Sequence, residues 1–216
     1  MSADVRWLVD GISPGNGWAL DLGGGTGGCR PLLESQGYRY VNVDVRRSGN
    51  GEPTVLGSAE ELPFRDQVFD LVISKDSLEH FLEPWRAVDE VYRVLRPGGS
   101  FLIWVPFMHG FHGDDAYRYT PLGLRHLLRG FRLVALESPL WVFSLLGQIV
   151  AAPLTRIRAR RIVSLIRIVC AWCDALFTAR SSRPRSLAVA YRVIAVKDAE
   201  CSTDGRQRLG SSHRTS

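Results

Sequence analysis

A glycine-rich segment, DLGGGTGG at Asp21–Gly28, limits the possible folds of this chain more than any other feature. An apolar run at residues 18–22 precedes it, and a segment compatible with a helix follows it. Gly23 and Gly25 permit positive φ angles and allow a ligand to approach the backbone closely where a strand turns into a helix. The segment therefore predicts a ligand site at the end of a buried strand.

Apolar runs alternate with helix-like stretches through the first 135 residues, which is the pattern of a parallel sheet covered by helices. We expect strands at residues 18–22, 40–45, 54–56, 69–74, 100–105, 131–136 and 187–196. Residues 85–95 place apolar side chains on one face, which predicts a helix that ends before Pro97. The expected fold class is α/β, with a doubly wound sheet.

About fifty residues separate the last two expected strands, far more than an ordinary connection contains. Residues 139–154 are uncharged and rich in large apolar side chains, and residues 156–177 predict a helix with a narrow polar stripe. We therefore expect an apolar and basic helical insert at 139–180, within a single domain at 1–197. Residues 198–216 have the composition of a disordered tail.

Charge is distributed unevenly along the chain. Residues 1–155 contain 14 basic and 18 acidic residues, whereas residues 156–185 contain eight arginines and one acid, Asp174. Such a basic segment predicts attraction to the phosphates of an anionic membrane surface or of nucleic acid, although a solvated helix face would have the same composition.

The insert itself leaves three arrangements open: a helical hairpin packed on the sheet, a partner-binding surface, or a hairpin lying in a membrane interface. A true span is not expected, because residues 138–155 give only 18 uncharged residues, with Gln148 and Pro153 among them. A spanning helix needs about 20 apolar residues.

The cysteines indicate a reducing compartment. Cys29, Cys170, Cys173 and Cys201 are too few and too irregular for a disulfide framework, and no signal peptide opens the sequence. We therefore expect a cytoplasmic protein, with peripheral membrane association as a possibility. Cys170 and Cys173 form a CxxC without further ligands nearby, which favours packing over zinc binding.

The glycine segment admits two cofactors. Read as GxGxxG through Gly23, Gly25 and Gly28, it fits a dinucleotide site, and Asp44 lies about 20 residues further on, where a ribose-binding acid is expected. An NAD(P)-dependent oxidoreductase is therefore one alternative.

Further sequence segments favour a cofactor other than a dinucleotide. DLGGGTG resembles motif I of the class I S-adenosylmethionine-dependent methyltransferases, and GSAEELPF at 57–64, LEH at 78–80 and RVLRPGG at 93–99 follow in the order of the type 11 methyltransferase family. The resemblance covers roughly residues 18–105. It implies a Rossmann-like, mostly parallel sheet with an antiparallel last strand, and S-adenosylmethionine as the cofactor.

The resemblance also assigns roles to residues. Asp21 would orient the glycine turn and the aminoacyl end of the cofactor, and Asp44 would accept the ribose hydroxyls, a role that suits a carboxylate. Ser58 stands where the family has an acid that contacts the adenine amino group. The full set expected to bind the cofactor is Asp21, Gly23, Gly25, Gly27, Asp44, Val45, Ser58, Ala59, Glu60 and Ser74.

Methyl transfer from a sulfonium is a direct displacement, so alignment of the reactants supplies most of the catalysis. An oxygen acceptor additionally needs a base, and the candidates are His80 and His112. The segment DAYRYT resembles a D-x-x-R-Y-T signature found in type 11 proteins linked with envelope or glycan biosynthesis. Residues expected to bind the acceptor are His109, Asp115, Tyr117, Arg118 and Tyr119. No metal is expected.

The predicted function is methyl transfer from S-adenosylmethionine to an oxygen atom of a small-molecule, lipid-linked or glycan-linked acceptor. Besides the oxidoreductase, a non-catalytic cofactor-binding module at a membrane remains an alternative. Nucleic acid is a less favoured acceptor, because residues 74–77 lack the NPPY-like tetrapeptide that would follow the fourth strand. The sequence does not indicate an oligomeric state.

Overall fold

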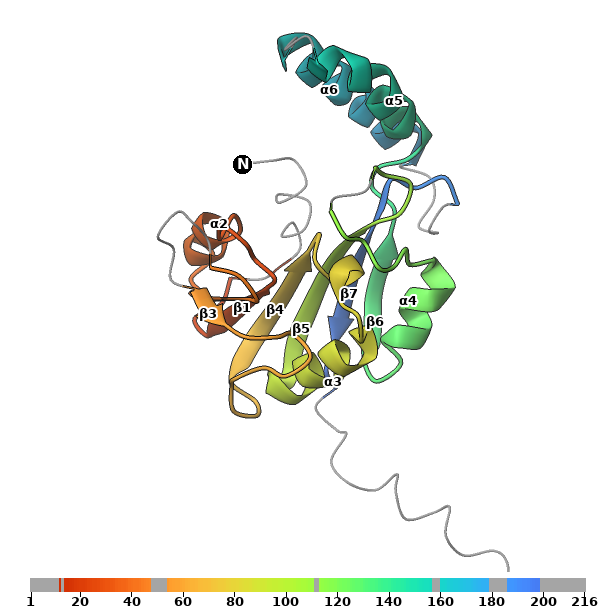
Figure 1. The fold of residues 1–216 in the computed structure, drawn as a ribbon. Coiled ribbons are helices and arrows are strands. Elements are labelled where there is room, and N and C mark those ends of the chain that lie inside the picture. Colours follow the sequence, from red (N-terminus) through yellow and green to blue (C-terminus); the bar gives the residue numbers. More distant parts are fainter. Residues whose placement is uncertain are drawn as a thin grey trace, which may run out of the picture.

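The computed structural model describes residues 12, 14–47, 54–110, 113–156, 160–178 and 186–198. One seven-stranded sheet runs through them in the order β3-β2-β1-β4-β5-β7-β6 (Figure 1). The strands are β1 (Trp18–Leu22), β2 (Arg39–Asp44), β3 (Thr54–Leu56), β4 (Phe69–Lys75), β5 (Leu95–Pro106), β6 (Arg132–Glu137) and β7 (Ala190–Val196). Strands β1 to β5 pair in parallel, whereas β7 is antiparallel to both β5 and β6. This confirms the predicted mostly parallel sheet with an antiparallel last strand.

Helices cover both faces of the sheet. Leu33 of α2 (Arg30–Ser35) packs on one face in a cluster with Ala19, Ile73 and Trp104. The apolar stripe of α3 (Pro84–Val94) and Leu124 of α4 (Pro121–Leu127) pack on the other face, in the larger part of the core. Alternate side chains of each strand point to opposite faces of the sheet, and both faces are covered by apolar side chains. The strands therefore have continuous apolar sequences instead of alternating ones.

The structure corrects three predicted boundaries. Helix α3 ends at Val94, and Leu95 already belongs to β5, which therefore starts five residues earlier than expected. Leu95 pairs with Phe69 of β4, and the register of the two strands shifts between Phe69 and Leu71. The segment Pro97-Gly98-Gly99 therefore forms an irregularity within β5, whereas the prediction placed it after the end of a helix. Strand β7 begins at Ala190 instead of residue 187.

The insert forms a helical hairpin of α5 (Val142–Arg156) and α6 (Arg160–Thr178). The predicted single helix at 156–177 is wrong in its first turn, because Arg156 ends α5. Figure 1 shows the hairpin projecting from the edge of the sheet at which β4 ends. Among the described residues, none of the helices combines the length and the apolar character needed to cross a bilayer.

Asp174 fastens the two helices of the hairpin together. Its buried carboxylate accepts hydrogen bonds from the backbone N–H groups of Trp141 (2.8 Å), Phe143 (3.1 Å) and Ser144 (2.9 Å). These N–H groups lie at the beginning of α5, where the helix has no carbonyl partners of its own. Asp174 is thus a buried cap rather than part of a solvated stripe. Gly147 allows close contact, since a Cβ atom there would lie 2.7 Å from the Cys170 Sγ.

Candidate active site

The glycine turn lies at the carboxyl end of β1 and forms an open cradle. Gly23, Gly25 and Gly27 have φ angles of 68°, 52° and 75°, which side chains rarely adopt. A Cβ atom on Gly23 would lie 2.7 Å from the Ser77 Cβ, whereas a Cβ atom on Gly25 would meet nothing within 4 Å. The turn is therefore tightly packed on its protein side and open to a ligand at Gly25.

The two predicted acids flank this cradle at different depths. Asp21 is buried and accepts a hydrogen bond from the Tyr40 hydroxyl (2.8 Å), and its burial raises the pKa of the carboxyl to about 6. Asp44 ends β2 and stays partly exposed, with its carboxylate accepting from the N–H groups of Gly25 (3.0 Å) and Arg46 (3.0 Å). Asp21 thus lies beneath the turn, close to Gly24, and Asp44 lies at the surface beside Gly25. Their roles toward the cofactor stay predictions.

The segment at 57–64 is held by internal hydrogen bonds. The Ser58 hydroxyl lies 3.0 Å from the Glu60 carboxylate, and the other Glu60 oxygen accepts from the Glu83 N–H (3.0 Å). Glu60 is therefore engaged in joining two loops, and Ala59 is buried. Val45 is exposed next to Asp44. The hydrogen bond from the Glu83 backbone N–H to Glu60 could not be predicted from local sequence patterns.

Two residues that sequence reasoning missed position the site. Ser77 donates to the Leu22 carbonyl (2.7 Å) and shares a hydrogen bond with Ser74 (2.7 Å), so the ends of β1 and β4 are joined. Ser74 is fully buried in this pair, which favours a positioning role, and its predicted contact with the cofactor stays a prediction.

Arg93 is the other missed residue. Its guanidinium donates to the carbonyls of Phe64 (2.8 Å) and Leu62 (3.1 Å), and it forms ion pairs with Glu90 and Asp66. Arg93 belongs to the RVLRPGG segment, and Leu62 and Phe64 belong to the LPF segment, so these hydrogen bonds hold the two segments together.

His80 lies at the carboxyl end of β4 with a carboxylate behind it. The η1 turn (Leu78–His80) places its Nδ1 atom 3.3 Å from the Asp115 Oδ1. The Asp115 side chain is 1% exposed and pairs with Arg118. The same His80 Nδ1 atom lies 3.3 Å from the Asp114 backbone carbonyl, with which it shares a hydrogen bond. Both neighbours of Nδ1 are acceptors, so a proton on Nδ1 leaves Nε2 as the acceptor, which is the arrangement of an oriented general base. The structure thus brings together His80, Asp115 and Arg118, which the sequence had assigned to two different roles.

Glu79 shares this cluster, and its carboxylate, the His80 ring and the Asp115 carboxylate each offer an atom within 4.8 Å of the others. Such a group could hold a small cation, but Arg118 already supplies a positive charge to Asp115. The absence of a metal stays a prediction.

Burial of Glu79 should make stability depend on pH. Its carboxylate oxygens have no hydrogen-bond partner within the described chain, and burial raises the pKa to about 7 from an ordinary value of 4.5. Folding therefore favours the protonated carboxyl, so its stabilising contribution is complete below pH 4.5 and is lost as the pH rises through 7. We expect Glu79→Gln to gain roughly 2 to 3 kcal/mol in unfolding free energy relative to the wild type between pH 5 and pH 8.

Urea unfolding at both pH values measures this difference, and the exposed Glu61→Gln is the control. A difference between variant and wild type that does not change with pH would mean that Glu79 titrates normally.

The tyrosines of the DAYRYT segment fix the η1 turn. Tyr119 is buried and donates to the Leu78 carbonyl (3.1 Å), and Tyr117 donates to the Leu82 carbonyl (3.1 Å). Both hydroxyls are engaged by the backbone, which favours an anchoring role over the predicted contact with the acceptor. His112, the second candidate base, lies outside the described residues.

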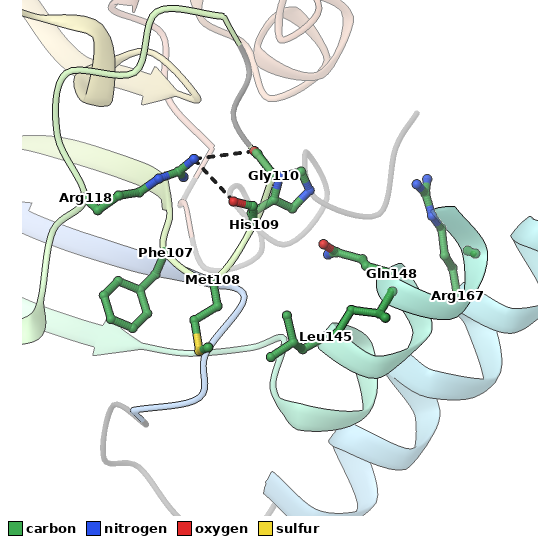
Figure 2. A pocket seen from close by; sticks show the side chains of 10 residues that line it. Phe107, Met108, His109, Gly110, Arg118, Leu145, Gln148 and Arg167 are labelled. Atoms are coloured by element: carbon green, nitrogen blue, oxygen red, sulfur yellow. Dashed lines mark hydrogen bonds between the residues drawn. The ribbon is translucent and has the colours of Figure 1, made fainter. Parts of the chain in front are cut away.

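Two cavities separate the edge of the sheet from the hairpin. The one in Figure 2 has a volume of about 630 Å³ and lies between the loop at 107–110 and the helices, with Gln148 and Arg167 directed toward it from α5 and α6. The other, of about 480 Å³, reaches the ends of β4 and β5 at Asp76 and Trp104. His109, Gln148 and Arg167 line both. Of the residues expected to bind the acceptor, His109 and Arg118 therefore reach a cavity.

Comparisons with known proteins agree with this geometry. Residues 20–103 match the model of a methyltransferase domain family of type 11. Over 144 residues the chain is 34% identical to an uncharacterized methyltransferase of Mycobacterium sp. (strain KMS), covering 61% of this chain and 54% of the relative. This chain carries a class I S-adenosylmethionine-dependent methyltransferase domain. It spans about half the length of the curated relatives that it matches.

Solved structures share the fold of this methyltransferase domain. Phosphoethanolamine N-methyltransferase 2 of Haemonchus contortus, in complex with S-adenosyl-L-methionine, superposes with a TM-score of 0.63 at 19% identity, over 90% of this chain and 52% of that one. The Burkholderia thailandensis 1,6-didemethyltoxoflavin-N1-methyltransferase, with S-adenosylhomocysteine bound, gives 0.57 at 18% identity, over 90% and 76%. These likenesses concern the fold alone.

The oxidoreductase alternative finds no support. The strand order of the methyltransferase domain ends in β5-β7-β6 with β7 antiparallel, whereas the dinucleotide-binding fold has the order 3-2-1-4-5-6 in a parallel sheet. The glycine spacing alone could not separate the two cofactors, because both use a glycine turn at the end of the first strand.

Proposed function

We propose that this chain transfers a methyl group from S-adenosylmethionine to an oxygen atom of a small-molecule or lipid-linked acceptor. The observation that carries the proposal is the juxtaposition of Asp44 with the open backbone of Gly25 at the sheet edge that also holds His80. Ligands of doubly wound sheets bind at this edge, where the strand order reverses between β1 and β4.

The cofactor supplies an electrophilic methyl group on a sulfonium. The chain's own contribution begins with binding, in which the Asp44 carboxylate would accept hydrogen bonds from the ribose hydroxyls and the glycine turn would accommodate the rest of the ligand. Asp21 and Ser77 keep that turn in shape from the protein side. Such a prearranged site supports catalysis by fixing the line between acceptor and methyl carbon.

Proton removal from the acceptor falls to His80. The Asp114 carbonyl and the Asp115 carboxylate each lie 3.3 Å from Nδ1, and Arg118 pairs with Asp115. Nε2 is therefore available to accept the proton of a hydroxyl as the oxygen–carbon bond forms and the carbon–sulfur bond breaks, which would release S-adenosylhomocysteine. This orientation supports methylation at oxygen, because a neutral hydroxyl is a poor nucleophile until its proton is taken.

The cavities support an acceptor with both apolar and polar parts. Phe107, Met108 and Leu145 provide apolar walls, and Arg167 provides a positive charge near them. A volume of about 480 Å³ at the ends of β4 and β5 suits a small molecule or the polar end of a lipid-linked compound.

Calorimetric titration of the purified chain with S-adenosylhomocysteine, and separately with NAD, tests the proposal. We expect micromolar affinity for the first ligand and no heat of binding for the second. Binding of NAD alone would overturn the proposal. Binding of neither ligand would instead favour a non-catalytic module.

A further inference from the structure

The hairpin carries an unusual number of exposed apolar side chains, of which Ile149 and Ile168 also line the cavities on the side toward the sheet. Nine large ones are between 51% and 71% exposed. They are Leu146, Ile149 and Val150 on α5, and Ile162, Leu165, Ile168, Val169, Trp172 and Leu176 on α6. They make up half of the exposed large apolar side chains of the described residues. A surface of this kind marks a site of contact with a protein or a membrane.

Five of these side chains form one stripe along α6. Ile162, Leu165, Val169, Trp172 and Leu176 follow one another at intervals of three and four residues, which places them on a single helix face. The stripe is not the face that packs on α5. Val163 and Asp174 are buried, and Asp174 caps the beginning of α5. The stripe is therefore left without a partner in the described chain.

Charge decides which partner fits. Residues 156–185 hold eight arginines, and their one acid, Asp174, is buried in the cap of α5 and does not offset them at the surface. Arg161, next to Ile162 at the tip of the hairpin, is exposed and has no carboxylate partner among the described residues. A second copy of the hairpin would bring like charges together, whereas lipid phosphates would neutralise them.

We propose that the outward face of the hairpin docks on an anionic membrane. The stripe lies at the boundary between head groups and acyl chains, and the arginines contact lipid phosphates. The helices lie along the surface, in keeping with the finding that no helix in the described part of the chain is suited to cross a bilayer. If the proposed function holds, docking also brings the cavities lined by Gln148 and Arg167 to the membrane, within reach of a lipid-linked acceptor.

Co-sedimentation of the full chain with vesicles tests the proposal without reference to activity. We expect binding to vesicles of phosphatidylcholine and phosphatidylglycerol, weak binding to phosphatidylcholine alone, and a decrease as salt is added. Leu165→Glu combined with Trp172→Glu should weaken binding about 100-fold, because each side chain leaves the acyl boundary. Arg161→Gln should weaken it about fivefold.

Matched controls separate this face from the rest of the surface. Leu122→Glu combined with Val134→Glu replaces two exposed apolar residues of α4 and β6 and should leave binding unchanged. S-adenosylhomocysteine titration without vesicles reports separately on the glycine turn, so failure of the proposed function is distinguishable from failure of docking.

Three results would overturn docking. The first is absence of binding to the anionic vesicles, and the second is binding that the hairpin variants do not reduce. The third is a dimer in sedimentation equilibrium that the Leu165 and Trp172 changes abolish, since this would make a second copy the occupant. As a check independent of the acidic variants, brominated lipid should quench wild-type tryptophan fluorescence, and Trp172→Phe should remove most of that quenching.

Discussion

Replacement of Asp44 with alanine is expected to weaken S-adenosylhomocysteine binding about 1000-fold. A carboxylate that accepts hydrogen bonds from two hydroxyls contributes about 1.5 to 3 kcal/mol for each bond, and 1.4 kcal/mol corresponds to a factor of ten. Asp44 lies at the carboxyl edge of the sheet beside the open Gly25 backbone and outside the apolar core. The substitution should therefore lower ligand affinity without disrupting the core. Calorimetry measures the affinity, and circular dichroism checks the fold.

Asp44 also holds the turn through the N–H groups of Gly25 and Arg46, which calls for a second variant. Asp44→Asn keeps an acceptor oxygen for the turn but loses the negative charge, so we expect an intermediate affinity. The exposed acid of α3 provides the control, Asp89→Ala, which should bind normally. Unchanged affinity in Asp44→Ala would remove this residue from the cofactor site.

Replacement of His80 with alanine is expected to lower kcat about 1000-fold while the affinity for S-adenosylhomocysteine stays unchanged. General bases contribute about 100- to 10,000-fold, and the Asp115 carboxylate orients this ring for the task. Transfer of labelled methyl groups from S-adenosylmethionine to a panel of phosphorylated and lipid-linked alcohols provides the acceptor and then the rate. The acceptor KM should change little, because the loss concerns the transition state.

His109 is the natural comparison, since it lines both cavities and its Nδ1 atom lies 3.0 Å from the Gly110 carbonyl. His109→Ala should therefore raise the acceptor KM more than it lowers kcat. If His80→Ala retains the full rate, or if His109→Ala shows the larger loss of kcat, His80 is structural and the base has to be sought elsewhere.

Local patterns in the sequence were enough to predict the sheet and the position of the glycine turn at its carboxyl edge. Apolar runs between glycine turns specify buried parallel strands, and the first such turn, followed by an acid at the end of the second strand, specifies a ligand at the carboxyl edge. Asp21, Gly23, Gly25 and Asp44 could be found because they are adjacent in sequence to the strands that position them. The beginning of β5 was misplaced by five residues because its pairing with Phe69 depends on a neighbouring strand and not on the local pattern.

Contacts between distant residues were decided only by the tertiary structure. The hydroxyl of Ser77 donates to the Leu22 carbonyl, and the guanidinium of Arg93 donates to the Leu62 carbonyl. Each pair is so far apart in the sequence that no periodic pattern of residues connects its two members. The pairing of His80 with Asp115 likewise depends on the fold of the intervening strand β5 and its following loop.

The hairpin shows the same division most clearly. Apolar and basic composition predicted helices at 139–180, but composition does not say which face is buried. Composition alone did not distinguish an exposed Asp174 from a buried one. The structure buries it against the N–H groups at the beginning of α5, because those donors lack partners in their own helix. The sequence by itself determined which segments form helices and strands, whereas packing decided which polar groups meet and which apolar face stays exposed.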